Sequence, residues 1–172
     1  MHHFILGMLL LGPLSLYDLH KQFSLGPSLF YSASFGSIQR ALRLLVDAGH
    51  VTVAGDPDGR RGRKLHTITD SGRETWAAWM RAPVDGSDAE TVMLAKVFLL
   101  GFVPEPDERR AIVDTLLARV RGDLAVLRDA GRGLDAQEIP AEAADLFRYQ
   151  RATLDYGIRA HELAEEWLIA LR

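Results

Sequence analysis

The sequence predicts a mostly α-helical protein in which one β-hairpin interrupts a series of helices. Three observations lead to this prediction. Apolar residues recur at helical spacing in the first third of the chain, two short segments typical of strands flank a turn rich in glycine, and helical spacing continues through the second half. The 172 residues include no cysteine, which excludes disulfides and thiolate metal sites.

Three helices are expected before the hairpin. The first, residues 4–11, is apolar and ends at Gly12-Pro13, because proline cannot continue a helical hydrogen-bond ladder. The second spans about 15–23. The third runs from about 36 to 48, with Ser34 or Ser37 as its N-cap and Gly49 in a left-handed conformation after its end.

The hairpin is predicted from strands at 51–53 and 64–68 around a tip at 55–62. A fourth helix should begin at Thr69 or Asp70 and end near Met80. Three helices, a hairpin and a fourth helix make the order of a winged helix-turn-helix, with the hairpin as a two-stranded wing.

The second half predicts helices at about 89–100, 107–129 and 141–171, with a break of the middle helix at Gly131-Arg-Gly133. The expected organisation is a winged helix-turn-helix domain at 1–81, a linker at 82–88, and a helical dimerisation domain at 89–172. No stretch reaches the roughly 20 apolar residues of a membrane span, so we expect a cytoplasmic protein without a membrane partner.

Charge divides the chain unequally. Residues 1–81 carry nine basic and six acidic side chains and residues 82–172 carry 11 and 17, which together account for the net charge of -3. Only the first part is therefore expected to meet a polyanion. The six histidines lack the spacing of a metal site, and no phosphate loop or nucleophile elbow is found, so we expect neither an enzyme nor a cofactor.

The residues suited to DNA lie on the third helix and on the wing. A polar helix front fits the major groove, and fixed positive charge on a hairpin fits phosphates. The candidates are Ser34, Ser37, Gln39, Arg40 and Arg43 on the helix, and Arg60, Arg61, Arg63 and Lys64 on the wing. A solvated basic surface is the alternative for each group alone, and a protein–protein interaction module without a DNA role is the alternative for the whole domain.

Several motifs resemble those of the PadR family of transcriptional regulators. Gly12-Pro-Leu-Ser-Leu-Tyr17-Asp-Leu resembles the family's opening motif, and the stretch from Ser34 to Leu42 is similar to its recognition helix. Residues 62–72 resemble its wing strand, and residues 94–102 and 156–158 its longer C-terminal domain. The chain departs from the family where Gln39-Arg40 replaces Tyr-Pro and His66 replaces Tyr. Tyr31 then becomes a candidate phosphate contact or a packing residue.

The resemblance implies a ligand-responsive repressor that binds an inverted-repeat operator as a homodimer. The last helix also indicates a dimer from its own pattern, because apolar residues cover more of its girth than the stripe of about 100° that a surface helix needs. The expected dimer residues are Leu154, Ile158, His161, Leu168 and Leu171, with Phe4 of the first helix implied by the resemblance.

Some PadR regulators bind phenolic acids or planar cationic drugs, which implies a small aromatic effector here. Trp76, Phe98 and Trp167 are the candidate pocket residues. The alternative is that they belong to the core, since aromatic residues at helical spacing usually do.

Overall fold

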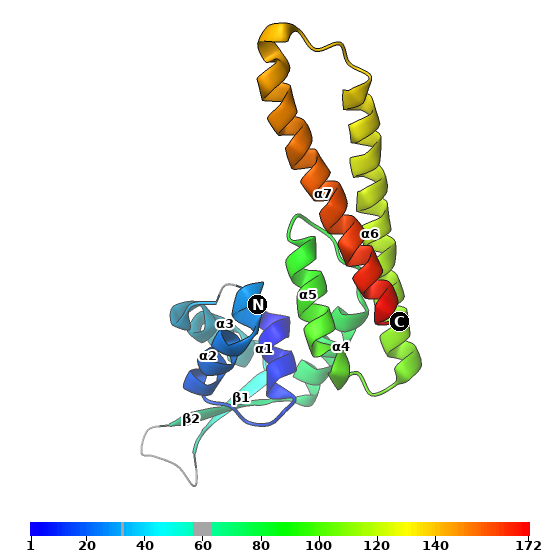
Figure 1. The fold of residues 1–172 in the computed structure, drawn as a ribbon. Coiled ribbons are helices and arrows are strands. Elements are labelled where there is room, and N and C mark those ends of the chain that lie inside the picture. Colours follow the sequence, from blue (N-terminus) through cyan, green and yellow to red (C-terminus); the bar gives the residue numbers. More distant parts are fainter. Residues whose placement is uncertain (32, 57–62) are drawn as a thin grey trace. The chain divides into compact units, whose positions relative to one another are not determined.

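The computed structural model describes residues 1–31, 33–56 and 63–172. This part of the chain is mostly helical with a two-stranded antiparallel sheet, which confirms the predicted fold class (Figure 1). Its contacts divide it into two compact units, Met1–Arg109 and Arg110–Arg172. Within the described residues, no helix has both the length and the apolar character needed to cross a membrane.

The first unit has the predicted order of helices around one hairpin. Its elements are α1 (His2–Leu9), α2 (Leu16–Leu25), η1 (Pro27–Leu29), α3 (Phe35–Asp47), β1 (Val51–Gly55), β2 (Lys64–Ile68), α4 (Asp70–Arg81), α5 (Ala89–Leu99) and η2 (Leu100–Phe102). The η elements are single 3-10 turns. The long helix α6 (Pro106–Asp135) begins in this unit.

Helix α3 has both of its predicted end signals. The Ser34 hydroxyl oxygen accepts the backbone N–H of Ser37 at 3.2 Å, so Ser34 is the N-cap. Beyond the other end, Gly49 has a φ of 74°, which glycine adopts without steric cost. The N–H of His50 then donates to the carbonyl of Leu45. These local bonds satisfy terminal backbone groups that the helix itself leaves unpaired.

The hairpin is joined to the start of α2 as well as to itself. Val51 and Ile68, which lie opposite each other in the antiparallel pair, are both buried. On the other side of β2, the N–H of His66 donates to the carbonyl of Leu14 at 2.9 Å, and the N–H of Leu14 donates back to His66 at 3.1 Å. The stem of the wing is therefore bonded to the segment that leads into α2.

The junction between the hairpin and α4 is closely packed. Thr69 caps α4 by accepting the N–H of Gly72 at 3.1 Å. A Cβ atom at Gly72 would lie only 2.3 Å from the carbonyl oxygen of His50. Glycine is needed here because a backbone atom occupies the space that a side chain would fill.

Helix α1 supplies the centre of the first core. Every residue from Phe4 to Leu9 is buried, and the helix contacts α3, α4, α5 and β2. The Phe4 ring packs among aromatic rings at centroid distances of 5.1 to 6.4 Å: Phe23, Phe30, Tyr31 and Phe98. This apolar helix is thus a core element of the first unit.

Helix α5 belongs to the first unit by its contacts, since it packs against α1. Its Lys96 is 1% exposed, and the ammonium group donates to the carbonyl of Ala82 at the end of α4. Burial lowers the pKa of Lys96. The expected linker at 82–88 therefore lies inside this unit, and the assignment of 1–81 and 89–172 to separate functions stays a prediction.

The second unit pairs the rest of α6 with α7 (Ala144–Ala170), after the short turn η3 (Ala141–Ala143). Ion pairs join the two helices along their length, and the residue numbers rise on one helix as they fall on the other, as in an antiparallel pair. They are Arg172 with Asp114 at 2.9 Å, Arg121 with Glu165 at 2.6 Å, Arg128 with Glu162 at 2.7 Å, and Arg151 with Asp135 at 2.8 Å.

The predicted break of the long helix at Gly131-Arg-Gly133 was wrong, because α6 continues to Asp135. Each glycine costs a helix only about 1 kcal/mol relative to alanine. Gly131 is buried, and side-chain atoms of Leu154 and Ile158 lie 3.8 Å from where its Cβ would be. Packing against α7 offsets the unfavourable helix propensity of these glycines. Local sequence rules do not include this packing, because α7 lies far along the chain.

Candidate nucleic-acid interface

Helix α3 presents a cationic surface opposite its buried stripe. Gln39, Arg40 and Arg43 are exposed. Neither arginine forms an ion pair within the described residues. Both guanidinium groups are therefore available to donate hydrogen bonds to an external anion or to a base edge. The buried stripe that orients this surface consists of Ile38, Ala41, Leu42 and Leu45.

The two serines predicted on the same surface have hydrogen-bond partners inside the helix. Ser34 caps α3, and the Ser37 hydroxyl donates to the Ser34 carbonyl at 2.8 Å. Ser34 is exposed and Ser37 is half-buried. Their position near the N-terminus of α3 agrees with the expected surface, while their contact with DNA stays a prediction.

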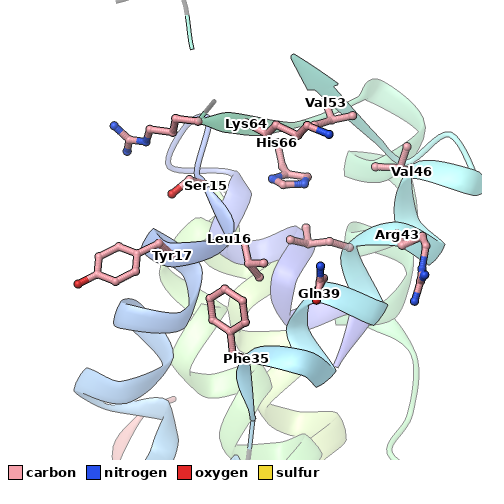
Figure 2. A pocket seen from close by; sticks show the side chains of 12 residues that line it. Ser15, Leu16, Tyr17, Phe35, Gln39, Arg43, Val46, Val53, Lys64 and His66 are labelled. Atoms are coloured by element: carbon pink, nitrogen blue, oxygen red, sulfur yellow. The ribbon is translucent and has the colours of Figure 1, made fainter. Parts of the chain in front are cut away.

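A groove of about 580 Å³ lies between α2, α3 and the hairpin (Figure 2). In Figure 2 the His66 ring points from β2 into this space, and the Phe35 ring lies at its other end. Four of the predicted DNA-binding residues line the groove: Gln39 and Arg43 from α3, Lys64 from β2, and Arg63 directly before β2. The fold therefore places the helix surface and the wing strand side by side.

The groove also contains residues that the sequence analysis did not select. Tyr17 is 68% exposed, and Phe35 is 45% exposed. Tyr17 lies off the apolar stripe of α2, so helical spacing predicts that its side chain is exposed. Phe35 had no such signal, because it occupies the first position of α3, where its ring packs edge-on to His20 at 5.6 Å.

Lys64 and His66 differ in how they meet the groove. Lys64 is exposed and has no ion pair in the described part of the chain. His66 is half-buried, and its Nδ1 lies 3.3 Å from the Leu14 carbonyl oxygen. Burial lowers the pKa of His66, which favours the neutral ring. Lys64 is thus the described wing residue with an available positive charge.

Arg63 is bound to two carboxylates of its own domain. Its guanidinium donates to Asp18 at 2.7 Å and lies 3.3 Å from Asp56. The hydrogen bond from the Ser15 side chain, followed by that from Arg63, lowers the pKa of Asp18 to about 2. The predicted phosphate contact of Arg63 would thus compete with an existing ion pair. Arg60 and Arg61, the other predicted wing cations, lie outside the described residues.

Tyr31 packs inside the first unit. Its ring stacks on Phe4 at 5.4 Å and meets Phe23 edge-on at 6.2 Å. Burial raises the pKa of the Tyr31 phenol. Of the two interpretations left open, packing is the one that these ring contacts support.

The residues expected at a dimer interface differ in accessibility. Phe4 is 1% exposed and Leu168 is fully buried in the single chain. Leu154 and Ile158 approach Gly131 of α6, as described above, so their stripe packs within the chain. His161 is half-buried, and its Nδ1 lies 2.8 Å from the Gly157 carbonyl oxygen. Leu171 is 43% exposed.

A different stripe of α7 is exposed. It consists of Leu146, Tyr149, Tyr156 and Leu163, each more than 60% exposed. At about 100° per residue these positions fall roughly opposite the stripe that packs on α6. None of these four was among the expected dimer residues, because spacing alone does not say which of two apolar stripes meets the neighbouring helix.

The candidate effector residues lie in both units. Trp76 is 5% exposed, and its indole N–H has no hydrogen-bond partner within the described residues. Phe98 is 46% exposed and packs against Phe4 and Phe30. Trp167 is half-buried on α7 of the second unit. A shared pocket of these three residues stays a prediction.

Comparison with known proteins supports the resemblance seen in the motifs. No protein-family model matches the chain. The chain is 32% identical over 98 residues to the negative transcriptional regulator PadR of Bacillus subtilis, and the match spans 55% of this chain and about half, 54%, of that protein. It is 27% identical over 171 residues to the protein named probable transcriptional regulator Rv1176c of Mycobacterium tuberculosis, a match that covers 88% of this chain and 85% of that protein.

Among solved structures, the chain is similar to that of Bacillus subtilis PadR in complex with operator DNA. The sequences are 24% identical, the match covers 99% of this chain and 96% of that chain, and the TM-score is 0.46. The motifs around Tyr17, α3 and β2 lie in the first unit, and the match to the mycobacterial protein extends over most of the chain. By these motifs and the two sequence relatives together, the chain is similar to transcriptional regulators, PadR of Bacillus subtilis among them.

Proposed function

We propose that the chain is a sequence-specific DNA-binding transcriptional regulator that contacts duplex DNA through α3 and the wing. The observation that carries the proposal is the common groove lined by Arg43 of α3 and Lys64 of β2, neither of them ion-paired in the part of the chain described. A polar helix fits the major groove, which is about 12 Å wide. Unpaired cations beside it would bind the flanking phosphates.

The first test is the salt dependence of binding to a random duplex, followed by fluorescence anisotropy. The logarithm of the binding constant should fall linearly with the logarithm of salt concentration, with a slope of roughly 0.9 for each phosphate contact. We expect tight binding at about 50 mM salt and a steep loss by about 200 mM. An absence of binding at low salt would instead favour a protein–protein interaction module.

The second test is selection of bound duplexes from a random pool. A twofold dimer should select an inverted repeat whose half-sites lie one helical turn, about 34 Å, apart. A selected motif without symmetry would contradict the dimeric arrangement while leaving DNA binding intact.

The homodimer is proposed to form through the exposed stripe of α7. Leu146, Tyr149, Tyr156 and Leu163 follow one another at intervals of three and seven residues, which is the spacing of a coiled-coil seam. An exposed apolar stripe of this length is unfavourable in water unless another surface covers it. A second copy of the same helix would cover it with an identical stripe, as twofold symmetry requires.

Sedimentation of a charged variant tests this interface. Tyr156→Glu combined with Leu163→Glu should convert the dimer to a monomer, because four like charges would meet across the seam. The matched control is Val126→Glu, which charges an equally exposed apolar residue (69%) on α6. Unchanged sedimentation of the double variant would exclude this stripe as the interface.

Repression and control by an effector complete the proposal. Repression follows the name of the relative in Bacillus subtilis, which is a negative regulator. The unpaired indole N–H of Trp76 supports an effector with a hydrogen-bond acceptor, because a buried donor without a partner costs roughly 1–3 kcal/mol. Hydroxycinnamic acids and planar aromatic cations are the probes. A rise in melting temperature that Trp76→Phe removes would support the site, and no shift with either class would refute it.

A further inference from the structure

Asp18 joins two structural elements through one carboxylate oxygen. This oxygen accepts the backbone N–H of Ser15 at 2.9 Å and the Ser15 hydroxyl at 2.6 Å, which completes a capping box at the start of α2. The same oxygen accepts the Arg63 guanidinium at 2.7 Å from the stem of the wing. One side chain therefore holds both the end of a helix and the start of β2.

The contact is partly shielded from solvent. Ser15 is only 6% exposed, and the side chains of Asp18 and Arg63 are 28% and 44% exposed. Arg63 also meets Asp56, at the end of β1, so the guanidinium spans both sides of the hairpin stem. The backbone pairing of Leu14 with His66 fixes the same region from the other side.

The contact connects the wing to α3 through α2. Helix α2 packs on α3 in the first core. Anchoring the wing stem to the first turn of α2 thereby sets where Lys64 lies relative to Arg43 across the groove. Two surfaces that must meet one duplex together need such a fixed spacing.

We infer that Asp18 is a positioning residue for DNA recognition and that Arg63 acts as its anchor rather than as a phosphate ligand. The inference rests on the proposed DNA-binding function. A phosphate that took Arg63 would have to displace two carboxylates. It would then leave Asp18 without its partner near a polyanion, and like charges repel.

A double-mutant cycle on the full chain tests the assignment, with the selected duplex and a random duplex as probes. Asp18→Asn retains an oxygen that can accept the Ser15 N–H, and Arg63→Gln leaves the α2 cap untouched. Each should weaken binding to the selected duplex about tenfold, and the double variant should weaken it no further, because the two residues act as one unit. Arg63→Lys, which keeps the charge beside Asp18, should restore most of the affinity.

The random duplex separates an anchor from a phosphate ligand. Arg63→Gln should leave the salt slope on this duplex unchanged, whereas the neighbouring control Lys64→Gln should lower it by about 0.9. A fall of the slope in Arg63→Gln, or tighter binding of the selected duplex by Asp18→Asn, would overturn the inference. Should Asp18→Asn lose its helical circular dichroism, Arg63→Gln alone decides. Failure of the wild-type chain to bind either duplex would instead refute the proposed function.

Discussion

Arginine serves two different purposes in the two units. In the second unit, Arg121, Arg128 and Arg151 each meet a carboxylate of the facing helix at 2.6 to 2.8 Å. In the first unit, Arg40 and Arg43 have no ion pair within the described residues. The same side chain thus pairs two helices in one unit and is left available to an external anion in the other.

This difference shows why counting charges identifies the functional surface only in part. The net charge is positive in residues 1–81 and negative in residues 82–172, yet the second part contains more arginines. Six of its arginines form ion pairs with acids: Arg119, Arg121, Arg128, Arg132, Arg151 and Arg172. Exposed pairs of this kind contribute roughly 0–1 kcal/mol each. Arg63 and Arg81 are exceptions in the first unit: two carboxylates hold Arg63, and Glu108 pairs with Arg81.

The largest expected effect comes from removing the unpaired cations. Arg43→Gln with Lys64→Gln should lower affinity for a random duplex about 100-fold at low salt, because two phosphate contacts and their counterion release are lost. The control is Arg121→Gln with Arg128→Gln, which removes the same number of positive charges from the paired set. Anisotropy titrations that gave equal losses for both double variants would show that net charge, not pairing, determines binding.

Replacing one glycine in each unit by alanine compares how tightly the two units pack around their glycines, with protein stability as the measure. Gly72→Ala should destabilise the protein by about 2 kcal/mol, because its Cβ would overlap the His50 carbonyl and overpacking against backbone is not relieved by rotation. Gly133→Ala in the exposed end of α6 should instead stabilise by roughly 0.5 kcal/mol, since nothing lies within 4 Å of its Cβ. Urea denaturation followed by circular dichroism measures both. A Gly72→Ala variant as stable as the wild type, or a Gly133→Ala variant less stable than the wild type, would contradict the packing described.

A further effect is expected at acid pH. Burial, together with the nearby N-terminus, lowers the pKa of His3 from 6.5 to about 4, and its ring stacks on Trp79 at 5.2 Å. The unfolded chain therefore takes up a proton at His3 more readily than the folded chain does. The contribution of neutral His3 to the free energy of unfolding is fully present above pH 6.5 and is lost as the pH falls toward 4. Because His3 is half-exposed, solvent screening lowers this contribution to on the order of 1 kcal/mol. His3→Phe keeps the stacking, and its melting temperature should fall less between pH 7.5 and 5 than that of the wild type.

The order of elements and most of their ends follow from the sequence alone. Ser34, Gly49 and Thr69 act through bonds to residues within a few positions, so local rules place the ends of α3 and the start of α4 correctly. The hairpin follows from short apolar segments around turn residues for the same reason. The exposed surface of α3 was also predictable, because its buried stripe leaves only one side for Gln39, Arg40 and Arg43.

Tertiary structure decided what depends on a neighbour far away in the chain. Gly131 stays helical because α7 packs beside it, and α7 exposes Tyr156 and Leu163 because its other stripe meets α6. Arg63 is held by Asp18, 45 residues away, a contact for which neither residue carries a local signal. Spacing along the chain determines which residues share a face, whereas only packing and desolvation of the folded chain determine which face is covered and which charge is neutralised.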